Sequence, residues 1–102
     1  MLSKKDANQD EIFDILRHAQ LVCYDLHKAG QSMPGFPDAL VVGYSLIEKC
    51  VMNVLVEIKS ETGRLEPSQK EWHSKYRNTH GGGRLPLIVA DDAQDILEWF
   101  GR

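Results

Sequence analysis

The sequence predicts an α/β fold with a mixed central β-sheet flanked by helices, in the order α-β-β-β-α-β-α. Three segments place apolar residues at helical spacing, and four short apolar runs lie between or beside them. Four strands are more than a simple doubly wound sheet would give, which favours mixed strand directions. The length of 102 residues is that of one domain, so residues 1–102 are expected to form a single unit.

The first third of the chain predicts a helix, a strand and a loop. Asp6 and Gln9 have the spacing of a capping box, and a helix is expected over residues 7–18. A strand is expected over residues 21–26, because its side chains alternate between two faces. Glycine, proline and serine then predict a loop over residues 30–37.

Two strands and a second helix are expected in the middle of the chain. Apolar runs predict strands over residues 39–42 and 51–59. Residues 44–50 form either the hairpin connection or an extension of a strand, and the sequence leaves both readings open. A helix is expected over residues 67–77, because Pro67 stands where a first helical residue tolerates proline.

The C-terminal segment predicts a short strand and a closing helix. Residues 87–90 form the fourth apolar run. Asp91 or Asp92 is expected to cap the helix that follows, because aspartate is a preferred N-cap residue. Trp99 and Phe100 then lie on this helix.

The composition is that of an ordinary globular protein, with 42% hydrophobic and 26% charged residues. A net charge of −3 argues against a strong non-specific nucleic-acid binder. There is neither a secretory signal nor an apolar run long enough to span a membrane. Cys23 and Cys50 lack metal-ligand spacing and are expected to be reduced core residues, which predicts a cytoplasmic location.

The charge is distributed unevenly along the chain. Residues 49–84 carry a net charge of +3, whereas both flanking segments are acidic. This basic third is either a nucleic-acid-binding surface or a solvated face of mixed charge. Its basic residues are Lys49, Lys59, Arg64, Lys70, Lys75, Arg77 and Arg84.

The candidate catalytic side chains lie at the end of the third expected strand. Because side chains alternate along a strand, Val54, Val56 and Ile58 share one face, which is predicted to meet the core. Leu55, Glu57 and Lys59 share the other face. A carboxylate and an ammonium group therefore leave an apolar strand side by side, and charges in such a place need partners.

Asp38 begins the preceding strand, directly after the turn at residues 35–37. In a hairpin its carboxylate would lie near Glu57, and two converging carboxylates repel each other unless a cation lies between them. Oxygen ligands suit Mg²⁺ or Mn²⁺. Each element alone has a simpler reading, because Glu-x-Lys occurs in surface ion pairs and aspartate often ends a turn. Their order and combination favour a metal site.

The series Pro37-Asp38, Glu57-x-Lys59 and Leu65-x-Pro67-x-Gln69 resembles the PD-(D/E)XK nuclease superfamily. More narrowly, it is similar to a VRR-NUC domain of the compact, stand-alone phage and bacterial type. The resemblance covers nearly the whole chain, from residues 6–12 to the closing helix. It implies a restriction-endonuclease-like fold. The family's Val-Arg-Arg tripeptide is absent, and residues 44–53 lengthen the stretch between Asp38 and Glu57.

The resemblance implies that Asp38 and Glu57 bind Mg²⁺ or Mn²⁺, with the backbone carbonyl of Ile58 as a third ligand. It implies that Lys59 is the catalytic lysine. A lysine beside such an ion would orient the attacking water and stabilise charge on phosphorus.

Two further residues acquire catalytic roles from the resemblance. Gln69, at the start of a helix, would point back into the site, although it has the position of half a capping arrangement. Glu11 would match an acidic residue that many family members place near the metal, although it is also compatible with a solvent-facing helix position.

Four side chains are candidates for phosphate contacts: Lys70, Arg77, Arg84 and His27. Each has the alternative reading of a surface or packed residue. His73, one residue after Trp72, is expected to be a helix-surface residue.

The predicted function is metal-dependent endonucleolytic hydrolysis of DNA phosphodiester bonds. The resemblance implies branched substrates such as Holliday junctions, cut by a homodimer. The alternatives are a flap-type or general DNA nuclease, or a non-catalytic DNA-binding module on the same fold. Residues 44–52 and the closing helix with Trp99 and Phe100 are the candidate dimer surfaces.

Overall fold

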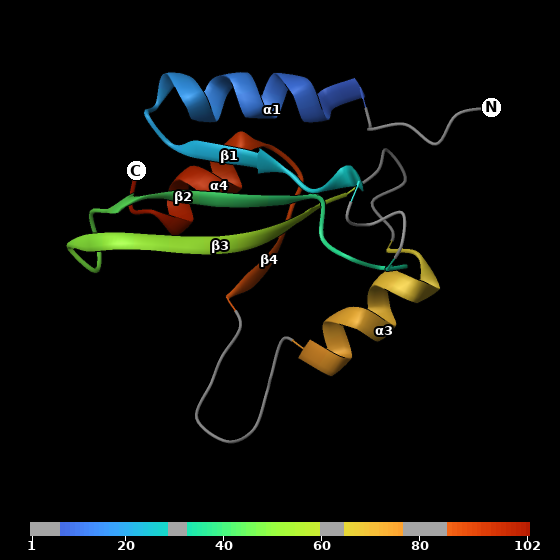
Figure 1. The fold of residues 1–102 in the computed structure, drawn as a ribbon. Helices are drawn as coiled ribbons and strands as arrows, with labels where there is room; N and C mark the ends of the chain where they lie inside the picture. The colour runs from blue at the N-terminus through green and yellow to red at the C-terminus, as the bar shows by residue number, and fades with distance from the viewer. Residues whose placement is uncertain (1–6, 29–32, 60–64, 77–85) are drawn as a thin grey trace.

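The computed structural model describes residues 7–28, 33–59, 65–76 and 86–102. The predicted order α-β-β-β-α-β-α is confirmed over these residues (Figure 1). The elements are α1 (Ala7–His18), β1 (Val22–Asp25), β2 (Ala39–Ser45), β3 (Cys50–Ile58), α3 (Pro67–Tyr76), β4 (Leu87–Ala90) and α4 (Ala93–Trp99).

The described strands form one mixed sheet in the order β1-β2-β3-β4. β2 pairs antiparallel with both β1 and β3, whereas β3 and β4 run parallel. Parallel neighbours cannot be joined by a tight hairpin, so the chain between β3 and β4 crosses over, and this crossover carries α3.

The β2–β3 hairpin settles the two readings of residues 44–50. Tyr44 and Ser45 extend β2, and residues 46–49 form the turn. The Ser45 Oγ accepts hydrogen bonds from the backbone N–H groups of Ile47, at 3.2 Å, and Glu48, at 3.0 Å. Lys49 closes the turn in the left-handed region, with φ at 58°.

One face of the sheet holds the hydrophobic core. Val54, Val56 and Ile58 are buried there, which confirms the face predicted for the end of β3. Helices α1 and α4 cover this face, because their buried apolar residues join the same cluster. They contribute Ile12, Phe13, Leu16, Ala93 and Ile96, and Phe100 at the end of α4 joins them.

Helix α3 lies on the other face of the sheet. Glu57 alternates with Val56 and Ile58 along β3, and its side chain contacts α3. Figure 1 accordingly shows α1 and α3 on opposite sides of the sheet.

The two cysteines are both free, but only one belongs to the core. Burial raises the pKa of the Cys23 thiol, although nearby Arg17 opposes the shift. The prediction that Cys50 is a core residue is wrong, because Cys50 begins β3 beside the hairpin turn and is exposed. In the described parts of the chain, no helix is both long and apolar enough to cross a membrane.

Candidate active site at the end of β3

Asp38 is fixed against the end of β3 by two hydrogen bonds. Its backbone N–H donates to the carbonyl of Val56 at 3.0 Å. Its Oδ2 accepts from the backbone N–H of Ile58 at 2.7 Å. These two partners, Val56 and Ile58, are the residues before and after Glu57. Asp38 is therefore hydrogen-bonded to β3 on both sides of Glu57. The N–H and C=O of a strand residue point to the same side, so the carbonyl of Ile58 also lies on the side of Asp38.

Glu57 is a fully buried carboxylate between β3 and α3. Its Oε2 accepts a hydrogen bond from Gln69 Nε2 at 2.8 Å. Its Oε1 lies 3.5 Å from Nε2 of His73. A buried charge is costly unless hydrogen bonds or opposite charge compensate it. The Gln69 amide donates to one carboxylate oxygen, and an imidazole nitrogen of His73 faces the other.

The Gln69 side chain makes two hydrogen bonds at once. While its Nε2 binds Glu57, its Oε1 accepts from the backbone N–H of Glu66 at 2.7 Å. The latter bond is one half of a capping box, because Gln69 is the third residue of α3. The helix start therefore orients the amide that contacts the carboxylate.

The loop before Asp38 packs tightly on α3. Gly35 has φ at 85°, and a Cβ atom there would lie 2.1 Å from the carbonyl oxygen of Ser68. Only glycine allows this approach of loop to helix. The Phe36 ring meets that of Trp72 edge to face, with centroids 5.4 Å apart. The loop that delivers Asp38 and the helix that contacts Glu57 are thus packed together.

Lys59 follows β3 directly and is partly exposed. Its backbone N–H donates to the carbonyl of Ala90 at 2.9 Å, which holds it against the end of β4. Its Nζ lies 3.3 Å from Oδ1 of Asp91. The backbone N–H of Asp91 in turn donates to Oδ2 of Asp95, at 2.9 Å. The lysine is therefore paired with a carboxylate at the start of the closing helix.

Three of the other predicted residues, Glu11, His27 and Lys70, lie outside this cluster. Glu11 is exposed on α1, and none of the described residues forms a hydrogen bond or ion pair with its side chain. His27 is half-buried just after β1, and its backbone N–H donates to Asp25 Oδ1. Lys70 is exposed on α3, next to Gln69. Arg77 and Arg84 lie outside the described residues.

The prediction that His73 is a surface residue is wrong, because its side chain is buried against Glu57. The signal that could have found it is its spacing: His73 is four residues after Gln69, and residues four apart lie on the same face of a helix. Apolar periodicity missed it because the residue that this helix face meets is a carboxylate.

The donor set at the end of β3 fits a divalent cation. Among the described residues no group of three or more His, Cys, Asp or Glu side chains is arranged to hold a metal. Mg²⁺ does not require such a cage, since it typically uses one or two carboxylates and keeps waters or substrate phosphates as its other ligands. Asp38, Glu57 and the carbonyl of Ile58 are hard oxygen donors of that kind.

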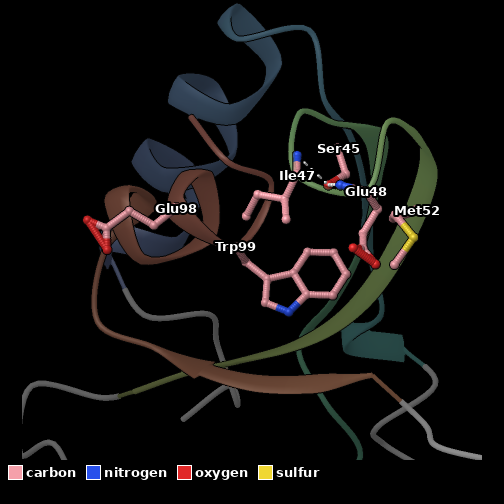
Figure 2. A pocket seen from close by; sticks show the side chains of 6 residues that line it. All are labelled: Ser45, Ile47, Glu48, Met52, Glu98 and Trp99. Carbon is pink, nitrogen blue, oxygen red and sulfur yellow. Dashed lines mark hydrogen bonds between the residues drawn. The ribbon is translucent and has the colours of Figure 1, made fainter.

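A separate pocket lies at the opposite end of the β2–β3 hairpin. It has a volume of about 370 Å³, and Figure 2 shows the Trp99 indole facing the turn that carries Ile47 and Glu48. Phe100, predicted at a dimer surface, is fully buried, so that part of the prediction is wrong. The pocket contains none of the residues at the end of β3. Its lining consists of Ser45, Ile47, Glu48, Met52, Glu98 and Trp99.

One of three comparisons with known proteins found a match. The family model of the VRR-NUC domain matches residues 2–91, which is nearly the whole chain. The comparison with curated proteins and the comparison with solved structures each returned no significant match. The matched range includes Asp38, the end of β3, and α3 with Gln69 and His73. The chain belongs to the VRR-NUC domain family, one of the PD-(D/E)XK-like nuclease families, and is a nuclease.

Proposed function

We propose that this nuclease is a metal-dependent endonuclease that hydrolyses phosphodiester bonds in DNA. One observation carries the proposal. Asp38 hydrogen-bonds to the residues on both sides of the buried Glu57, and Lys59 leaves the same strand end. A binding module has no need to maintain a buried carboxylate beside a second carboxylate and a lysine.

Asp38, Glu57 and the carbonyl of Ile58 would hold Mg²⁺ or Mn²⁺. When bound, such an ion supplies Lewis-acid polarisation of the phosphoryl group. Asp38 is held in place by the Ile58 N–H, and Glu57 by Gln69, so both carboxylates are oriented before the ion arrives. This orientation matters because ligating carboxylates depend on the hydrogen bonds that fix them.

Lys59 acts on the reacting groups directly in this proposal. It orients the attacking water and stabilises the negative charge that builds up on the phosphoryl oxygens. Its pairing with Asp91 holds the side chain near the strand end. Glu11 stays a prediction: its exposed position on α1 is compatible with a substrate contact.

DNA would approach along α3 and the end of the sheet. Lys70 is exposed one residue from Gln69. His27 directly follows Leu26, whose backbone N–H donates to the carbonyl of Asp38. Arg77 and Arg84 remain predicted phosphate contacts. Lys49 belongs to the same basic third but lies in the hairpin turn, a nine-residue strand away from the site.

A homodimer acting on branched DNA is the finer form of the proposal. The apolar tip of the β2–β3 hairpin supports it, because Tyr44 and Val51 pair across the strands there and both are exposed. The exposed apolar residues at this tip are Tyr44, Leu46, Ile47 and Val51. Exposed apolar patches often mark protein interfaces, and a two-fold dimer would bring two active sites to one junction. The free cysteines are compatible with a cytoplasmic location.

A cleavage assay tests the proposal. Junction, flap, duplex and single-stranded DNA are incubated with Mg²⁺, Mn²⁺ or chelator, using wild type and an Asp38→Asn, Glu57→Gln double variant. We expect cleavage by the wild type with metal only. Preferential cutting of flaps or plain duplex would favour the flap-type or general nuclease. Metal-independent DNA binding without cleavage of any substrate would favour the non-catalytic module.

A further inference from the structure

We propose that His73 is a positioning residue which, together with Gln69, holds Glu57 in the orientation that a divalent cation requires. The inference rests on the proposed function for the role of Glu57. It adds a residue to which neither the sequence nor the family match assigns a role. Its starting point is the 3.5 Å separation between His73 Nε2 and Glu57 Oε1, both on buried side chains.

The burial of Glu57 makes its surroundings decisive. A solvent-exposed carboxylate can reorient and bind water instead, but Glu57 has no solvent-accessible surface. Its conformation is therefore set by the protein groups that face its two oxygens. Gln69 Nε2 faces Oε2 and His73 Nε2 faces Oε1, so each oxygen has a nitrogen from α3 beside it.

Helix geometry links the two nitrogens. Gln69 and His73 are four residues apart, so they lie one turn apart on the same face of α3. Gln69 is fixed at its other end by the Glu66 N–H, and the helix is fixed by the contact between Phe36 and Trp72. Both nitrogens are thus presented by a helix whose position is independently determined.

Metal binding uses the same carboxylate that these nitrogens orient. A carboxylate oxygen has two lone pairs, so it can accept a hydrogen bond and still ligate an ion. Loss of a residue that orients a ligand typically lowers metal affinity by about 10–100-fold. Removal of the His73 nitrogen should therefore weaken metal binding although His73 itself is no ligand.

Three substitutions of His73 separate the effect of its nitrogen on Glu57 from the effect of its side-chain packing. His73→Leu keeps an apolar volume and removes the nitrogen. His73→Gln places an amide nitrogen at about the reach of Nε2, whereas His73→Asn is polar but too short. Glu71→Gln, at an exposed position on the same helix, is the matched control. If His73→Leu does not fold, the comparison of His73→Asn with His73→Gln carries the same information.

Two readouts test the inference. Calorimetry measures Mn²⁺ affinity, and NMR of the metal-free protein follows the side-chain amide of Gln69, which reports its bond to Glu57. We expect His73→Leu and His73→Asn to weaken Mn²⁺ binding by about 10–100-fold and to shift the Gln69 amide signals. We expect His73→Gln to restore both and Glu71→Gln to change neither.

The outcomes separate this inference from the proposed function. If the folded variants keep wild-type Mn²⁺ affinity and wild-type Gln69 signals, His73 does not position Glu57 and the inference is overturned. If wild type binds no Mn²⁺ but the Gln69 signals respond as expected, His73 orients Glu57 and it is the metal-dependent function that fails.

Discussion

Substitutions of Gln69 measure how much its hydrogen bonds to Glu57 and Glu66 contribute to the free energy of unfolding. Its amide nitrogen binds the buried Glu57, and its amide oxygen binds the Glu66 N–H at the helix start. Hydrogen bonds to charged groups contribute about 1.5–3 kcal/mol, and neutral ones about 0.5–1.5 kcal/mol. Gln69→Leu removes both, so we expect it to lower the free energy of unfolding by about 2–4.5 kcal/mol.

Gln69→Glu separates the two bonds. Glutamate at this position accepts from the Glu66 N–H as glutamine does, so the capping bond is kept. Its second oxygen has no proton to donate to Glu57 and repels that carboxylate instead. We therefore expect Gln69→Glu to lose at least the part of the free energy that comes from the bond to Glu57, about 1.5–3 kcal/mol.

Urea unfolding followed by circular dichroism measures these differences, with Glu71→Gln as the exposed control on α3. Surface changes of that kind usually alter stability by less than about 0.5 kcal/mol. If Gln69→Glu is as stable as wild type, the bond between Gln69 and Glu57 contributes nothing to docking α3. The position of Glu57 would then have to be set by groups other than the Gln69 amide.

Three further predictions follow from the same geometry. Lys59→Ala should lower the turnover number for DNA cleavage by about 10²–10⁴-fold while Mn²⁺ affinity stays near wild type; equal turnover would remove Lys59 from the reaction. Gly35→Ala should destabilise the protein by more than the about 1–2 kcal/mol that a left-handed backbone costs alanine, because its Cβ would meet Ser68; unchanged urea unfolding would contradict the packing of loop on helix. Lys70→Ala should lower the slope of DNA affinity against salt by about 1, and an unchanged slope would move the DNA surface elsewhere.

The parts of the fold that could be predicted are those with regular patterns and explicit end signals. The predicted bounds of α1 and β4 are the observed ones, because apolar periodicity and terminal residues mark them clearly. Asp92 is the N-cap of α4, one of the two residues predicted. The alternation along β3 was sufficient to separate the core face from the Glu57 face. The sequence did not locate the hairpin turn, because the Ser45 hydroxyl rather than a glycine sets the backbone of this turn.

The contacts within the site could be predicted only in part, for a physical reason. That Asp38 lies beside the end of β3 follows from hairpin pairing, which is a local rule. The environment of Glu57 depends on how α3 crosses back over the sheet, and local patterns do not specify a crossover. The pairing of Lys59 with Asp91 is of the same kind, since it joins the ends of two parallel strands that are distant in sequence.

The structure of α3 explains why its inner face carries so weak a sequence signal. A helix that packs on a sheet usually presents an apolar stripe, and among residues 67–75 of α3 Trp72 is the only buried apolar side chain. In place of a stripe it presents Gln69 and His73 to a carboxylate. Removing one partner of such a buried polar contact weakens the docking of the helix, because the remaining buried group is left uncompensated. The residues that hold the Glu57 carboxylate are therefore also residues that dock α3 on the sheet. A substitution at Gln69 or His73 is expected to affect both the geometry of the site and the docking of the helix.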